Sequence, residues 1–207
     1  EVTGELVLGT LADPETLRLG SLLSVLAEKL PLLGIKTRHG GAEELRELVT
    51  AGQLQGAFYI GPQLPRDLAS VPLRVLHYRI VGPQRDRDRL LRAGWGELAA
   101  MPWVGGSARH HAHALLQGLF ARQGLTLRQT VESDETALPF NLARAGVGLA
   151  LVPEELALAA SERQELVIWP HARLTAQLAF VYALAAEHEP ALVAVLSALR
   201  SVWGRSA

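Results

Sequence analysis

The first 61 residues alternate between short apolar segments and segments with apolar residues at helical spacing. This alternation restricts the fold more than any other feature of the sequence. Apolar runs at Glu5–Leu8, Ile35–Arg38 and Ala57–Ile60 predict strands. Leucines three and four residues apart predict two intervening helices, which end near Pro31 and Gly52. The order strand, helix, strand, helix, strand is typical of a parallel sheet covered by helices, so an α/β fold is predicted.

A similar strand–glycine–helix pattern starts again near residue 103. The short strand Trp103–Val104 is followed by Gly105, Gly106 and Ser107, which are expected to open a helix. The next apolar run, Leu127–Glu132, predicts a further strand. The chain therefore contains a loose duplication of its opening pattern.

The segment Phe140–Pro153 predicts a helix end, a glycine turn and a short buried strand. Ser133 and Asp134 are expected to cap the helix that leads into it. Gly146 suits the left-handed conformation that closes a helix. Gly148 suits a strand start that approaches a neighbouring backbone closely.

The C-terminal part predicts two separate strands and a final helix. The strand Leu166–Trp169 is expected to end at Pro170, because proline cannot donate a hydrogen bond to a neighbouring strand. Leu178–Leu184 predicts another, strongly apolar strand, and Pro190 suits the first turn of a helix.

Two of the predicted strands, Leu73–Val81 and Leu178–Leu184, are expected to connect two lobes. Lobe I would contain residues 1–77 and 176–207, and lobe II residues 78–175. Each lobe would be a mostly parallel sheet flanked by helices, with a ligand cleft between the lobes.

The composition excludes several classes of protein. The net charge of −1, from 20 basic and 21 acidic residues, argues against a basic face that grips nucleic acid. The absence of cysteine excludes disulfides and thiol nucleophiles. No apolar run reaches the ~20 residues that a membrane helix needs. The N-terminal segment has no basic start and no long apolar core, so no signal peptide is expected, and a leader already removed stays an alternative.

No residue pattern predicts a metal site or catalysis. His110 and His113 are three residues apart and suit one helix face, but no cysteine exists and the helix carries no carboxylate. Together with His111 they are expected to be partly solvated surface. The motifs of serine hydrolases, phosphate-binding loops and zinc proteases are absent. The chain is expected to have no metal, no cofactor and no enzyme activity.

Three loops suit a small anionic ligand. The loops Thr10–Asp13, Gly40–Ala42 and Gly105–Ser107 follow predicted strands and precede predicted helices. Parallel sheets bind ligands at the carboxyl ends of their strands, where helix N-termini present free N–H groups. Ordinary helix capping explains the same residue types equally well.

Four features occur in a fixed order along the chain. They are the strand Gly4–Gly9, the Asp-Pro after it, the Gly-x-Leu at Gly52, and the sequence AGVGLALVP at Ala145–Pro153. Taken together, they resemble the effector-binding domain of LysR-type transcriptional regulators over nearly the whole chain. The resemblance implies a two-lobed, type 2 periplasmic-binding-protein-like architecture with an effector cleft.

The resemblance also implies the ligand residues. By position in the family pattern they are Thr10, Leu11, Gly41, Gly61, Gly105, Gly106, Ser107 and Ser133. Ala42 departs from the pattern, since a hydroxyl residue is frequent there. The apolar first loop favours an effector with an aliphatic or aromatic part.

The partners follow from the same resemblance. They are a small-molecule effector, expected to carry a carboxylate, and a second copy of the chain, with a tetramer as the alternative for the full-length protein. DNA would be bound only through a segment absent from this chain. The protein is expected in the cytoplasm and is not expected to bind a membrane. Two other classes of protein stay open, namely an exported solute-binding protein of a transporter and an enzyme on the same fold.

Overall fold

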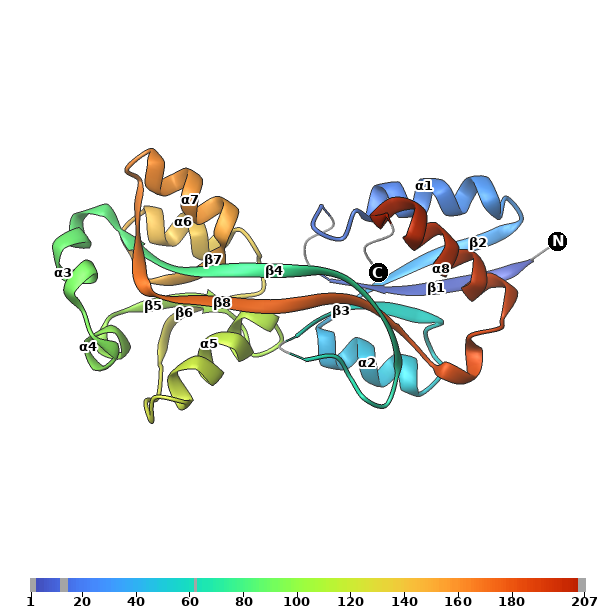
Figure 1. The fold of residues 1–207 in the computed structure, drawn as a ribbon, viewed down its shortest axis with the longest axis horizontal. Coiled ribbons are helices and arrows are strands. Elements are labelled where there is room, and N and C mark those ends of the chain that lie inside the picture. The colour runs from blue at the N-terminus through green and yellow to red at the C-terminus, as the bar shows by residue number, and fades with distance from the viewer. Residues whose placement is uncertain (1–2, 12–14, 62, 205–207) are drawn as a thin grey trace. The chain divides into compact units, whose positions relative to one another are not determined.

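The first three strands form the parallel sheet that the sequence predicts. β1 (Gly4–Thr10) lies between β2 (Leu33–His39) and β3 (Gly56–Gly61) and is parallel to both. The connecting helices are α1 (Leu19–Lys29) and α2 (Ala42–Thr50). In the computed structural model, α1 and α2 cover opposite faces of these strands (Figure 1).

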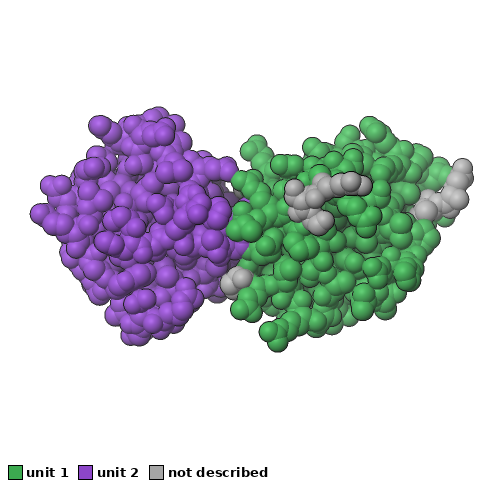
Figure 2. Space-filling model, in the orientation of Figure 1, with its two compact units in different colours: residues 1–75, 177–207 green, residues 76–176 purple. Residues whose placement is uncertain are grey.

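The model describes residues 3–11, 15–61 and 63–204, and the chain forms two compact units (Figure 2). Unit 1 contains residues 1–75 and 177–207, and unit 2 contains residues 76–176. Two long strands, β4 (Ala69–Pro83) and β8 (Leu166–Tyr182), each contain residues of both units. The chain therefore passes from unit 1 to unit 2 along β4 and returns along β8.

Close contact between β1 and its neighbours leaves no room for a side chain at Gly9. A Cβ atom there would lie 2.6 Å from the Cβ of Ala57 and 3.0 Å from a methyl group of Leu45. The first contact is too short for real carbon atoms, and the second would require Leu45 to shift. Glycine at this position lets β1 pack against β3 and α2 at once.

The C-terminal helix α8 (Pro190–Trp203) packs beside α1 and completes unit 1. The guanidinium of Arg18 lies 4.4 Å from the centre of the Trp203 ring and donates a hydrogen bond to the Val202 carbonyl (2.9 Å). Lys29 Nζ donates to Ser197 Oγ at the other end of α1 (3.1 Å). The two helices are thus joined at both ends of α1.

Unit 2 is built around a second parallel pair of strands, β5 (Trp103–Gly106) and β6 (Gln129–Ser133). β7 (Ala150–Pro153) pairs with β4 in the antiparallel sense. The core of unit 2 contains Trp103, Phe120 and Trp169, all with fully buried side chains. The helical segments of unit 2 are η1 (Gln84–Asp86), α3 (Arg87–Arg92), α4 (Trp95–Ala100), α5 (His111–Ala121), α6 (Leu138–Arg144) and α7 (Glu154–Glu162), and η2 (Leu184–Ala186) precedes α8 in unit 1.

Two details differ from the sequence prediction. Pro170 does not end a strand, because β8 continues without interruption for 17 residues. Proline has a φ near −65°, which is compatible with an extended chain, and Pro170 is exposed. Helix α4 was not predicted, since its six residues are too few to show helical periodicity.

The glycine turn before β7 is confirmed. Gly146 has a φ of +84°, and the N–H groups of Gly146 and Val147 donate to the carbonyls of Ala143 (3.0 Å) and Leu142 (2.9 Å). A Cβ on Gly148 would lie 2.7 Å from the carbonyl oxygen of Pro102. The backbone at Gly148 therefore approaches a neighbouring backbone as predicted.

We expect Gly148→Ala to lower the free energy of unfolding by about 1–3 kcal/mol, because the backbone of Pro102 cannot move away without disturbing β5. Gly20→Ala is the matched control, since a Cβ on this exposed residue of α1 would have no neighbour within 4 Å. The control should raise stability by roughly 0.5–1 kcal/mol. Urea unfolding followed by tryptophan fluorescence measures both, and equal effects would contradict the packing argument.

Candidate functional site

Four of the predicted ligand residues meet at the carboxyl ends of β5 and β6. Gly105 and Gly106 are the last residues of β5, and Gly106 is in register with Ser133 at the end of β6. Ser107 follows β5, and its N–H donates to the carbonyl of Ser133 (3.3 Å). These residues form one edge of unit 2.

Ser107 does not cap a helix, in contrast to the sequence prediction. α5 starts at His111, and its cap is His110, whose Nδ1 accepts the N–H of Ala112 (3.2 Å). The Ser107 hydroxyl accepts the N–H of Arg109 (3.4 Å) in a turn that precedes the helix. Serine forms such local bonds in turns as readily as in helix caps, so the residue type alone did not fix the start of α5.

Ser133 does not cap a helix either. Its hydroxyl accepts the N–H of Glu135 (3.0 Å), whereas α6 starts at Leu138 and has no side-chain cap. Pro139 lies in the first turn of α6 and suits a helix start by itself. Both serines therefore lie in loops that separate a strand from a helix.

The hydroxyl group of Ser107 is hydrogen-bonded to Asp134. The Ser107 Oγ–H donates to the carboxylate of Asp134, and both residues are accessible to solvent. A ligand carboxylate would have to compete with Asp134 for this proton and would be repelled by its charge. A hydroxyl or ammonium group would instead be attracted by Asp134.

The two glycines of β5 have a packing role. The side-chain amide of Gln129 occupies the position that a Cβ on Gly105 would take, and a Cβ on Gly106 would lie 2.5 Å from the Cβ of His110. A Cβ on Gly105 would displace only the flexible end of Gln129, whereas a Cβ on Gly106 would require His110 itself to shift. The packing therefore requires glycine most strictly at Gly106.

The three histidines near this edge have protein partners. His111 Nε2 lies 2.7 Å from the Tyr78 hydroxyl, and His113 Nδ1 lies 3.2 Å from Gln129 Oε1. The rings of His110 and His111 stack, with their centres 4.5 Å apart. Among the described residues, no three His, Asp or Glu side chains are arranged to hold a metal ion.

Burial keeps the stacked histidines neutral. Loss of solvent lowers the pKa of His111 to about 3, and the adjacent His110 lowers it further in the same direction. Burial also lowers the pKa of His110, an effect that the charge of Asp134 opposes. All three histidines stay partly exposed, as predicted, although each has a protein partner.

The other predicted ligand residues lie in unit 1. Thr10 ends β1 and is 5% exposed, the following Leu11 is buried, and Gly61 ends β3. The N–H of Gly40 donates to the Thr10 carbonyl (3.2 Å), and Gly41 directly precedes α2. Thr10 and Gly41 thus lie close together at the carboxyl ends of β1 and β2. The helix start predicted at Asp13 and Pro14 lies outside the described residues.

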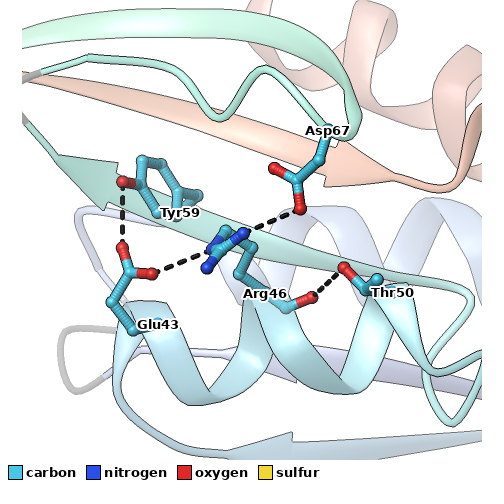
Figure 3. Close-up of polar contacts among 5 residues, drawn as sticks. All are labelled: Glu43, Arg46, Thr50, Tyr59 and Asp67. Atoms are coloured by element: carbon cyan, nitrogen blue, oxygen red, sulfur yellow. Dashed lines mark hydrogen bonds and ion pairs between the residues drawn. The ribbon is translucent and has the colours of Figure 1, made fainter.

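Next to Gly61, a polar network joins α2 to the loop after β3 (Figure 3). The Tyr59 hydroxyl donates to Glu43 (3.3 Å), and Arg46 donates to Glu43 (2.8 Å) and to Asp67 (2.7 Å). Burial, followed by the nearby charge of Glu43, raises the pKa of Tyr59. A Cβ on Gly61 would lie 2.6 Å from the Tyr59 hydroxyl, so Gly61 makes room for this network.

The sequence analysis missed the network and the role of Asp134. The spacing of Glu43 and Arg46 on α2 is a known signal for an ion pair on a helix. Their other partners, Tyr59 and Asp67, come from different elements and have no local signal. The same holds for Asp134, which is 27 residues from Ser107.

A known protein family matches nearly the whole chain. The family model for the LysR substrate binding domain matches residues 1–204. The chain belongs to this family. LysR substrate-binding domains are ligand-binding parts of transcriptional regulators and are not an enzyme family.

A curated relative supports the assignment. The HTH-type transcriptional regulator BbuR of Bordetella bronchiseptica is 27% identical over 154 residues. The match covers 74% of this LysR substrate-binding domain and 47% of BbuR. The chain therefore spans about half the length of this relative.

Solved structures confirm the predicted periplasmic-binding-protein-like α/β fold. The regulatory domain of Synechocystis PCC6803 CcmR in complex with 2-PG has a TM-score of 0.74 and 16% identity, and the match covers 99% of each chain. The effector-binding domain of QuiR in complex with shikimate has a TM-score of 0.72 and 13% identity, with 97% of each chain covered. Full-length CbnR complexed with its target DNA has a TM-score of 0.64 and 19% identity, with 98% of this chain and 72% of CbnR covered. None of the described helices of this LysR substrate-binding domain is long and apolar enough to span a membrane.

We expect the stability of the domain to fall as the pH is lowered from 6.5 to 5. The pKa of His111 is about 3 in the folded state and near 6.5 in the unfolded state, so the unfolded state binds more protons in this range. The loss for this one group is about 2 kcal/mol over 1.5 pH units. Urea unfolding at several pH values measures it.

His111→Gln should reduce this pH dependence, because glutamine does not titrate. The range above pH 5 separates the histidines from the carboxylates, such as Glu154, whose pKa is lowered from 4.5 by the hydrogen bond with Arg173. An equal slope in the variant and the native chain would show that His111 is not the titrating group.

Proposed function

We propose that this domain senses a small-molecule effector and thereby changes the DNA binding of a regulator to which it belongs. The observation that carries the proposal is the convergence of Gly105, Gly106, Ser107 and Ser133 at the carboxyl ends of parallel strands, where such sheets bind ligands. Membership of the LysR substrate-binding family supports it. The same membership favours a regulator over an exported solute-binding protein.

The proposed effector site uses residues of both units. From unit 1 it takes Thr10, Leu11, Gly41 and Gly61, and from unit 2 the four residues at the ends of β5 and β6. We infer that the lobes are residues 1–77 with 176–207 and residues 78–175, and that the effector binds in a cleft between them.

The chemistry of the two sets differs. The start of α2 after Gly41 offers backbone N–H groups and the positive end of the helix dipole, which suit a carboxylate. Asp134 beside Ser107 suits a hydroxyl or ammonium donor. A small carboxylate that also carries a hydrogen-bond donor, together with an apolar part near Leu11, satisfies both sets.

The effector acts by shifting an equilibrium between arrangements of the regulator. It favours the arrangement that it binds more tightly, and only by that difference in affinity. We propose a cytoplasmic homodimer in which α1 contributes to the contact between copies, with a tetramer as the alternative in the full-length protein. DNA is bound by a further domain, as the name of BbuR suggests for the half of that relative outside the match.

Thermal unfolding with added ligand tests the proposal. Shikimate, 2-PG and a panel of small hydroxy- and amino-carboxylates serve as probes, because a ligand at 100 times its Kd stabilises a folded protein by about 2.7 kcal/mol. We expect at least one probe to raise the Tm, and Ser107→Ala and Thr10→Val to reduce that shift.

Ser161→Ala and Thr126→Val are the controls, since Ser161 lies in α7 and the exposed Thr126 lies before β6, at the opposite end of that strand from Ser133. They should leave the shift unchanged. Full ligand response in both Ser107→Ala and Thr10→Val would place the effector elsewhere.

A further inference from the structure

A partly buried hydrogen bond in unit 2 joins α5 to β4. His111 is the first residue of α5, and its Nε2 lies 2.7 Å from the hydroxyl of Tyr78 on β4. The two rings are also in edge contact, with their centres 5.6 Å apart. An imidazole that loses part of its hydration is stabilised by a hydrogen-bond partner, so Tyr78 has a specific role that an apolar residue cannot fill.

His110 extends this contact to the end of β5. Its ring stacks on His111, and its Nδ1 accepts the N–H of Ala112. Its own N–H donates to the carbonyl of Ser107 (2.9 Å), and its Cβ packs against the bare face of Gly106. Only Ser107, Ala108, Arg109 and His110 separate β5 from α5.

The position of Ser107 therefore depends on the position of His111. A displacement of His111 moves the stacked ring of His110, and His110 is bonded directly to the Ser107 carbonyl. Asp134, the residue after β6, accepts the Ser107 hydroxyl proton, so Ser107 is restrained both from the end of β6 and, through His110, from the start of α5. The loop between β5 and α5 is only four residues long, so Ser107 cannot move far without moving His110.

We propose that Tyr78 and His111 are positioning residues, which hold Ser107 in place and link it to β4. The statement that Ser107 contacts the effector rests on the proposed function above. β4 is one of the two strands through which the chain passes between units, and Tyr78 is the third residue of unit 2 on that strand. A ligand that moves Ser107 would therefore act on β4 through the contact between His111 and Tyr78.

Amide hydrogen exchange of the 207-residue chain without ligand tests the link. Tyr78→Phe removes only the hydroxyl, and Tyr59→Phe is the matched control, because Tyr78 and Tyr59 are 5% and 7% exposed and each hydroxyl has a hydrogen-bond partner. We expect the amides of residues 107–113 to exchange at least tenfold faster in Tyr78→Phe. The control should leave these amides unchanged.

Two further variants separate the hydrogen bond from simple packing. His111→Gln keeps a side-chain group that can bond to Tyr78, and we expect exchange at 107–113 to stay within about threefold of the native rate. His111→Leu fills space without the bond and should behave like Tyr78→Phe.

Unchanged exchange at 107–113 in both Tyr78→Phe and His111→Leu would overturn the proposal. An equal increase in β1 of unit 1 would also overturn it, because it would show general destabilisation. The experiment contains no effector, so its failure leaves the proposed function standing. Conversely, a failure of every probe in the thermal assay leaves the exchange result standing.

Discussion

Close packing at the ends of strands is the constraint on which the rest of this structure depends. Gly9, Gly61 and Gly106 each have another side chain in the space that their own would occupy. The neighbouring groups belong to Ala57, Tyr59 and His110, respectively. Bare backbone at these points lets strands and helix starts approach each other. Gly61 and Gly106 also belong to the proposed effector site, and the packing role of a glycine does not exclude a role in binding.

The polar side chains at the strand ends decide which ligand groups the site can bind. Ser107 is bonded to Asp134, so the edge of unit 2 presents a carboxylate rather than a free hydroxyl. The solved relatives with shikimate and 2-PG are 13% and 16% identical, a level at which the fold is shared and the ligand contacts are not fixed. A fold hosts many ligands, and the residues at the site select among them. Asp134 is the residue that most distinguishes this site from a simple carboxylate-binding loop.

Two kinds of contact explain where the structure departs from the sequence prediction. Ser107 and Ser133 were expected to cap helices, but each accepts an N–H group two residues further along in a turn, and local preference does not distinguish a cap from a turn. Pro170 was expected to end a strand, yet β8 continues through it. The partner of His111 is Tyr78, 33 residues away, and no local pattern indicates it.

The sequence by itself determined most of the order of helices and strands, the parallel opening sheet, the left-handed turn at Gly146 and the family. These features depend on periodicity, glycine and proline, which act over a few residues, and on their order along the chain. The tertiary structure alone decided the partners of Ser107, His111 and Arg46. Their hydrogen bonds join different elements, and the energy of a polar side chain depends on whether such a partner is within about 3 Å once the chain has folded. No local pattern in the sequence carries that distance.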